Sequence, residues 1–274
     1  MKIDAHQHFW QFDPVRDTWI TEGSMKVIRH DFSPKDLFPI LQQNGIKGCV
    51  AVQANNSEAE TLYLLDLAEQ NSFIKGVVGS IDFKADNFSE RLDYFAQFPK
   101  LKGFRLIPNG YPIYLLEYDF KLKLKEIAKR GYTFDLLLDY QHLSAAQAFF
   151  AYSDPQRLVI DHMAKPNIKD KRIKQWAKDM KAIAEYKHVR CKLSGLITEA
   201  DWNKWKESDL TPYIDVIFEA FGTTRIMYGS DWPVCLLAGT YEKQLSVVTN
   251  YISKLTPYEQ KKIMGLNAQR FYNL

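Results

Sequence analysis

The sequence has few cysteines, and their spacing excludes several kinds of site. The three cysteines, Cys49, Cys191 and Cys235, form no Cys-x-x-Cys pair, and an odd number cannot all join in disulfides within the chain. Cys49 and Cys191 lie inside apolar runs, where a thiol is expected to be buried and unreactive. We therefore expect structural thiols in a reducing compartment rather than a catalytic cysteine.

Long apolar runs and an excess of one charge sign are also missing. No apolar stretch approaches the ~20 residues that span a bilayer, and the charged, histidine-rich N-terminal segment is unlike a secretory signal. The 36 Lys and Arg residues nearly balance the 33 Asp and Glu residues, which leaves a net charge of +3. This balance argues against a nucleic acid or a membrane surface as the main partner. We expect a cytoplasmic protein, monomeric or homodimeric, that acts on a small molecule.

Short β-rich runs alternate with amphipathic segments along the 274 residues. Several of the eight runs are almost wholly apolar, as in parallel strands that are buried on both faces. This alternation predicts an α/β protein of the TIM-barrel, (β/α)8 type, with residues 1–274 in a single domain. The predicted strands are Lys2–His6, Gly48–Gln53, Ile74–Ile81, Leu101–Ile107, Tyr132–Leu138, Arg157–Asp161, Val189–Leu193 and Arg225–Tyr228.

Helix starts are predicted from serine and threonine caps, because the side-chain oxygen of these residues satisfies a free N–H of the first turn. A proline directly after the cap fixes the backbone of that turn. By these rules we expect helices to begin after Ser33, Ser57, Thr211 and Thr256.

Histidines at the start of the chain and an aspartate near its end indicate a catalytic site. His6 and His8 alternate along the first strand, so both side chains are expected on one face, with Gln7 on the other. Two imidazoles on one face can bind a divalent metal or hydrogen-bond a substrate oxygen. Asp231 follows the last strand after Gly229, and a carboxylate there can bind metal or take a proton from water. A barrel brings its first and last strands together, so we predict one site that contains all three groups.

Other strands end in further polar groups. His162 follows the sixth strand, and Lys165 lies on the next loop. Arg105 lies near the end of the fourth strand, in Gly103-Phe104-Arg105, and Lys192 near the end of the seventh, in Cys191-Lys192-Leu193-Ser194-Gly195. Arginine binds a carboxylate with two hydrogen bonds or supports an oxyanion, whereas lysine acts as a point charge. We expect His162 and Arg105 in the catalytic set, and the two lysines to bind an anionic or polyhydroxylated ligand.

Aromatic residues gather near the same strand ends. The segment Phe9–Phe32 precedes any predicted helix and carries Trp10 and Trp19 close to His8. In a barrel this loop lies on the face where active sites form, which favours the two tryptophans as a substrate wall. Trp232, next to Asp231, completes the predicted substrate-binding set.

Six motifs together carry a family resemblance. They are Asp4-Ala5-His6-Gln7-His8-Phe9-Trp10, Lys102-Gly103-Phe104-Arg105, Phe134–Leu143, Val159–Pro166, Cys191–Leu196 and Tyr228–Cys235. In this order the sequence resembles the amidohydrolase superfamily, and within it the branch of sugar lactonases and pyrone-dicarboxylate lactonases, such as L-fucono- and L-rhamnono-lactonases. The resemblance covers almost the whole chain.

The resemblance implies a (β/α)8 barrel that hydrolyses a cyclic ester. In that chemistry Asp231 removes a proton from the attacking water and passes it to the departing ring oxygen. The lactone carbonyl is polarised by His6, His8 and His162, either directly or through a metal. A zinc-dependent decarboxylase of the same superfamily and a non-catalytic sugar-acid-binding barrel are the alternatives.

The sequence departs from the superfamily pattern at two places. The fifth strand, Phe134–Leu138, offers neither the bridging lysine nor the glutamate of two-metal members. One zinc or other divalent ion held by His6, His8 and Asp231, with His142 or His162, remains consistent with the sequence, and so does metal-free catalysis. After the fourth strand, Arg105–Tyr111 departs from the sugar-lactonase pattern, which predicts an altered substrate pocket.

Overall fold

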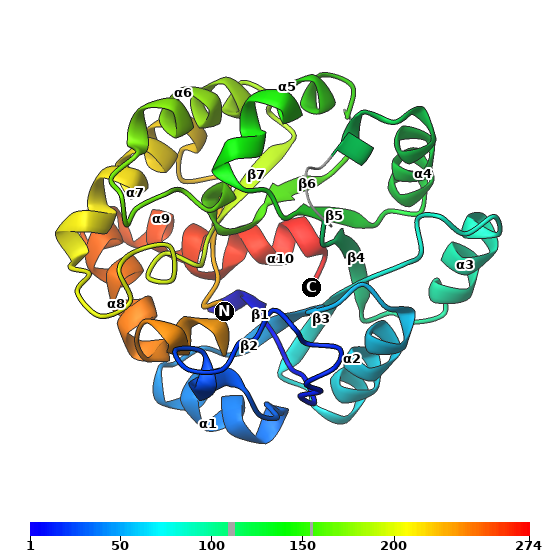
Figure 1. Cartoon of the computed structure of the whole chain (residues 1–274), viewed down its shortest axis with the longest axis horizontal. Helices are drawn as coiled ribbons and strands as arrows, with labels where there is room; N and C mark the ends of the chain where they lie inside the picture. Colours follow the sequence, from blue (N-terminus) through cyan, green and yellow to red (C-terminus); the bar gives the residue numbers. More distant parts are fainter. Residues whose placement is uncertain (109–112, 154–155) are drawn as a thin grey trace.

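The computed structural model describes residues 1–108, 113–153 and 156–274, and its centre is one sheet of eight parallel strands (Figure 1). The strands are β1 (Ile3–Gln7), β2 (Gly48–Val52), β3 (Ile74–Gly79), β4 (Leu101–Leu106), β5 (Thr133–Leu136), β6 (Leu158–Ile160), β7 (Val189–Leu193) and β8 (Ile226–Tyr228), paired in chain order. Each strand falls within one residue of a predicted run at its start, so the (β/α)8 prediction is confirmed.

Helices surround the sheet on its outer side, except α10 (Asn267–Tyr272), which lies across the barrel (Figure 1). They are α1 (Pro34–Gln43), α2 (Glu58–Gln70), α3 (Phe88–Phe95), α4 (Tyr118–Lys129), α5 (Leu143–Ala151), α6 (Ile173–Ala184), α7 (Glu207–Phe221), α8 (Tyr241–Ile252), α9 (Pro257–Lys261) and α10 (Asn267–Tyr272). The predicted starts after Ser33, Ser57 and Thr256 are confirmed. Among the described residues, no helix is long and apolar enough to cross a bilayer.

The predicted helix start after Thr211 is wrong, because α7 begins at Glu207, four residues before Thr211. Asp209 accepts a hydrogen bond from the backbone N–H of Lys206 and so caps the helix there. The Thr211 hydroxyl instead donates to the carbonyl of Glu207 inside the helix.

Two apolar layers hold the barrel. The larger lies between the sheet and the outer helices, and the smaller fills the barrel interior. Helix α10 lies across the barrel in Figure 1, and its apolar side chains close the interior layer from one end. The interior cluster consists of Ile3, Ala5, Val50, Val52, Val78, Val159, Met227, Ala268, Phe271 and Tyr272.

The three cysteines are buried and free, as predicted. Cys49 lies in β2 and Cys191 in β7, while Cys235 follows β8. Burial raises the pKa of each thiol, so none of them is a thiolate at neutral pH.

The barrel closes where the chain after β8 meets β1. The backbone N–H of Asp231 donates to the carbonyl of His6 at 2.8 Å, and the N–H of His8 donates to the carbonyl of Trp232 at 2.7 Å. Gly229 permits this approach, because a Cβ at that position would lie 2.6 Å from the Cβ of His6. The closing hydrogen bonds therefore place Asp231 directly beside both histidines.

Candidate active site

A register irregularity in β1 turns the two histidines toward the barrel mouth. Asp4 contacts Tyr241 of the outer helix α8, yet His6, two residues later, faces inward. The pairing of β1 with β2 shifts between Asp4 and Gln7, and such a bulge reverses the alternation of faces. Gln7 then points away and donates to the sulfur of Cys49, so His6 and His8 share one face.

Four side chains converge at the mouth of the barrel. The Nε2 atoms of His6 and His8 lie 3.2 Å apart, and Asp231 Oδ1 lies 3.4 Å from His8 Nε2 and 3.9 Å from His6 Nε2. His162 Nε2 lies 3.9 Å from the same Oδ1 atom. The structure thus brings together the His6, His8, His162 and Asp231 of the predicted site, from three different strand ends.

Hydrogen bonds behind the histidines orient their rings. His8 Nδ1 lies 2.7 Å from the carbonyl oxygen of Val52, which only accepts, so Nδ1 carries a proton and Nε2 is the atom that faces the site. His162 Nδ1 lies 2.9 Å from the hydroxyl of Ser194. Burial lowers the pKa of His162 to about 4 despite the nearby Asp231, so this imidazole is neutral at pH 7.

Burial alone would raise the pKa of Asp231, but the surrounding His162, His8 and His6 lower it below its usual range. Asp231 is therefore ionised at neutral pH. Its backbone has φ of 58°, a left-handed conformation that carries the side chain toward the histidines. Oδ1 faces the imidazoles, while Oδ2 has no hydrogen-bond partner among the described residues.

The donor atoms of His6, His8 and Asp231 fit one divalent metal ion. Regular tetrahedral zinc with bonds of about 2.05 Å separates its ligand atoms by about 3.3 Å, and the three observed separations are 3.2, 3.4 and 3.9 Å. Two groups of described residues meet the requirement for a metal site, His6 with His8 and Asp231, and His6 with Asp161 and His162. His142 belongs to neither group.

A buried ion network lies inside the barrel directly behind His6. Lys192 Nζ lies 2.6 Å from Asp135 Oδ2, 2.9 Å from Asp161 Oδ1 and 3.0 Å from His6 Nδ1. Arg105 donates to Asp161 Oδ2 at 3.1 Å, and it also donates to the carbonyl of Gln53. These contacts fix the ring of His6 and the guanidinium of Arg105.

The position of Lys192 corrects its predicted role as a substrate-binding residue. Its side chain is 0% exposed, because it projects into the barrel rather than into the mouth. Asp135 and Asp161, its partners, were missing from the predicted site. The sequence pattern around Asp135 and Asp161 could have indicated them, because each is a single acidic residue among apolar strand residues, as in Phe134-Asp135-Leu136.

A cavity of about 660 Å³, which we call the catalytic cavity, opens over the candidate cluster of His8, His162 and Asp231. Its walls include the predicted Trp10, Trp19, Lys165 and Arg105, and Trp10 and Trp19 meet edge to face at 6.0 Å. It also includes residues that the sequence did not single out; among them are Thr18, Met25, Asn55, Asn56, Thr198, Glu199, Trp202, Val234 and Leu237.

Trp232 does not line this cavity, which corrects its predicted contact with substrate. It is 1% exposed and packs edge to face on Phe9 and Phe32. The altered pocket predicted from Arg105–Tyr111 is described only in part, since residues 109–111 lie outside the described ranges. Ile107, from the described part of that segment, lines the cavity.

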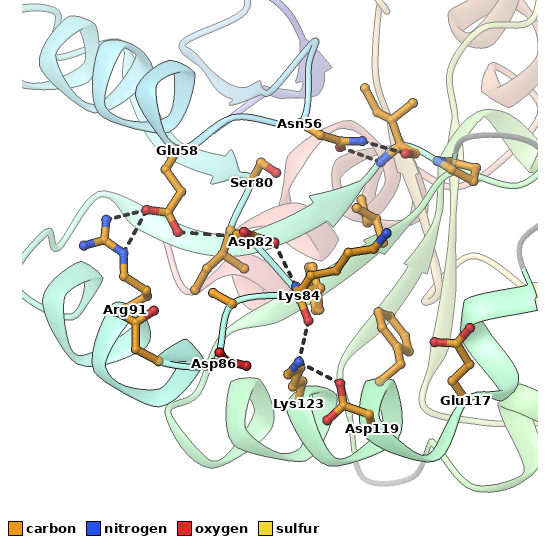
Figure 2. Close-up of a pocket in the computed structure, with 18 residues that line it drawn as sticks. Asn56, Glu58, Ser80, Asp82, Lys84, Asp86, Arg91, Glu117, Asp119 and Lys123 are labelled. Atoms are coloured by element: carbon orange, nitrogen blue, oxygen red, sulfur yellow. Dashed lines mark hydrogen bonds and ion pairs between the residues drawn. The ribbon is translucent and has the colours of Figure 1, made fainter.

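A larger hollow of about 1190 Å³ lies on the other side of Asn56 (Figure 2). Asn56 exchanges two hydrogen bonds with the backbone of Ile107, and these two residues separate the hollow from the catalytic cavity. Charged groups of the hollow pair with one another, as Arg91 does with Glu58 (Figure 2). None of the described residues that line this hollow is a histidine, so the cavity over Asp231 is the candidate active site.

Comparisons with known proteins agree with this assignment. The amidohydrolase family model matches residues 3–274. An L-fucono-1,5-lactonase of Burkholderia multivorans is 36% identical over all of this chain and 96% of its own length, and an L-fucono-1,5-lactonase of Burkholderia ambifaria is 35% identical with the same coverage.

Solved structures are also similar to this chain over almost its whole length. The crystal structure of an amidohydrolase from Burkholderia multivorans with bound zinc superposes with a TM-score of 0.96, at 34% identity, over 100% of this chain and 99% of the other. A probable pyrone-dicarboxylic acid hydrolase from Acinetobacter baumannii shares the fold, with a TM-score of 0.77 at 16% identity over 100% of this chain and 99% of that one. The histidine and aspartate cluster at the barrel mouth and the match over almost the whole length establish that this chain belongs to the amidohydrolase family.

Proposed function

We propose that this protein is a lactone hydrolase that opens a sugar-acid lactone such as L-fucono-1,5-lactone. The observation that carries the proposal is the placement of Asp231 beside three imidazoles at the floor of a cavity with tryptophan walls. Relatives that are 35–36% identical over the full chain carry the name L-fucono-1,5-lactonase, which supports this substrate class.

Asp231 is the proposed general base. Its carboxyl group is ionised at neutral pH. Oδ2 is therefore free to accept a proton from a water molecule that attacks the lactone carbonyl. The ester C–O bond then breaks, and Asp231 returns the proton to the departing ring oxygen. The product is a hydroxy acid, which releases one proton at neutral pH.

Arg105 and His162 are the proposed stabilisers of the negative charge that develops on the carbonyl oxygen. Both line the cavity, and both are held before substrate arrives, Arg105 by Asp161 and His162 by Ser194. A donor that is already in position stabilises a developing oxyanion without a reorganisation cost.

We further propose that His6, His8 and Asp231 hold one divalent ion, zinc being the best match to two nitrogen donors and one oxygen donor. When bound, such an ion polarises the lactone carbonyl or lowers the pKa of water. The protein residues set its position: Val52 orients His8 through Nδ1, as an outer hydrogen-bond acceptor does in many metal sites.

The test is a pH-indicator assay with purified protein on neutral aldonolactones and a pyrone dicarboxylate. We expect acid release from a sugar lactone, and a loss of about 10²- to 10⁴-fold in kcat for Asp231→Asn. Asp86→Asn makes the same change in the hollow of Figure 2 and serves as the control, which is expected to keep full activity. No hydrolysis of any lactone, or carbon dioxide release from an aromatic acid, would refute the proposal.

A further inference from the structure

Glu199 stands out among the residues of the catalytic cavity. It follows β7 and lines the same cavity as Asp231 and His162. Its main chain is fixed, because Lys169 donates to its carbonyl and Trp202 donates to the carbonyl of the preceding Thr198. The carboxylate is therefore held at the wall of the cavity by an ordered loop.

The carboxylate of Glu199 has no hydrogen bond or ion pair within the described ranges. Glu60, a more deeply buried acid elsewhere in the chain, accepts hydrogen bonds from two backbone N–H groups, whereas Glu199 is half-buried at the cavity wall. Burial raises the pKa of Glu199 to about 7, while the nearby charge of Lys165 lowers it and that of Asp231 raises it further. The acceptor oxygens of Glu199 are thus free at the wall of the catalytic cavity, where a ligand that fills the cavity can donate hydrogen bonds to them.

The surroundings of Glu199 define the chemistry of that ligand. A carboxylate accepts hydrogen bonds from hydroxyl groups, and Lys165 beside it can donate to a hydroxyl or ring oxygen. Trp202 adds an aromatic surface to the same wall. Above pH 7, where Glu199 is mostly ionised, a second carboxylate on the ligand would be repelled at this position.

We propose that Glu199 is a specificity-determining residue that binds substrate hydroxyl groups and selects neutral, hydroxylated lactones over carboxylate-bearing ones. The inference rests on the proposed lactonase activity and names the substrate class that this cavity accepts. In this proposal Glu199 binds hydroxyl groups of the sugar while Asp231 acts on the reacting carbonyl, so Glu199 affects binding more than the chemical step.

The experiment compares wild-type protein with Glu199→Gln and Glu199→Ala on an aldonolactone and on unsubstituted δ-valerolactone. Asp201→Asn is the matched control, since Asp201 lies two residues away and outside the catalytic cavity. The readouts are kcat and KM for each lactone, or an inhibition constant where a lactone is bound without turnover.

Loss of a hydrogen bond to a charged group lowers affinity by about 10- to 100-fold. We expect this loss in kcat/KM for the aldonolactone, mainly through KM, with less than about a twofold change for δ-valerolactone. Glu199→Gln is also expected to improve relative activity on a carboxylate-bearing sugar lactone. Asp201→Asn is expected to match the wild type.

Equal losses on both lactones, or a loss confined to kcat, would overturn the inference, because Glu199 would then act on the reacting atoms or on the fold. No change on the aldonolactone would also overturn it. Wild-type protein that binds and hydrolyses neither lactone would instead overturn the proposed function itself, and with it this inference.

Discussion

Replacement of Lys192 by methionine is predicted to destabilise the barrel from the inside. Lys192 is fully buried, and its ammonium lies 2.6 Å from Asp135 and 2.9 Å from Asp161, both of which are also fully buried. Methionine fills a similar volume but leaves two carboxylates without their shared cation. Removing one partner of a buried ion pair costs about 3–5 kcal/mol, because the remaining charge is uncompensated.

The free energy of unfolding, measured by urea denaturation with tryptophan fluorescence, tests this estimate. Asp135 has a pKa raised to about 6 by burial even with Lys192 present. Without the lysine, Asp135 is expected to take up a proton near neutral pH, which limits the cost toward the lower end of the range. Asp135→Asn in the Lys192→Met protein removes the unpaired charge and is expected to recover part of the lost stability.

The reasoning about Lys192 fails if Lys192→Met unfolds within about 1 kcal/mol of the wild type, well below the cost of breaking a buried pair. It also fails if the costs of Lys192→Met and Asp135→Asn simply add, since coupled residues in one network deviate from additivity by about 0.5–3 kcal/mol. Lys181→Met, an exposed lysine paired with Glu219, is the control, and a surface pair of that kind contributes about 0–1 kcal/mol.

Two further predictions concern pH and metal. Burial raises the pKa of Glu60 from an ordinary 4.5 to about 7, so the native protein binds more protons than the unfolded chain between these values. Stability relative to Glu60→Gln is therefore expected to fall by about 3 kcal/mol from pH 4.5 to 8 in urea titrations, and a difference that is independent of pH would contradict this. Metal analysis of the purified protein is expected to find one divalent ion per chain, and about none in a His6→Ala, His8→Ala double variant, whereas equal contents would exclude these ligands.

The strands were predictable because a parallel barrel needs apolar residues on both faces. Runs such as Cys49-Val50-Ala51-Val52 have no polar residue that a solvent-facing strand would require. The cluster of candidate catalytic residues was predictable for a related reason, since polar groups that follow such runs meet at one end of the barrel. His6, His8, His162 and Asp231 all lie there.

Other features were not predictable from spacing. The bulge in β1 places both Ala5 and His6 inside the barrel, and the strict alternation of faces assumed from sequence cannot represent it. Lys192 was grouped with the cations at the barrel mouth, although its side chain projects into the barrel interior, where it pairs with Asp135 and Asp161. Glu199 was missed because its position depends on loop hydrogen bonds, for which no periodic pattern exists.

Closure of the barrel and formation of the site depend on the same atoms. Asp4 accepts hydrogen bonds from the N–H of Ser230 at 2.9 Å and from the hydroxyl of Tyr241 at 3.0 Å, which ties the chain after β8 to β1. The next residue, Asp231, donates its N–H to His6 and holds its carboxylate against His8. Any change that separates the chain after β8 from β1 must therefore move Asp231, the proposed base, away from both histidines. It follows that activity is expected to decline before the barrel unfolds, because a shift of about 1 Å is enough to disturb catalytic geometry.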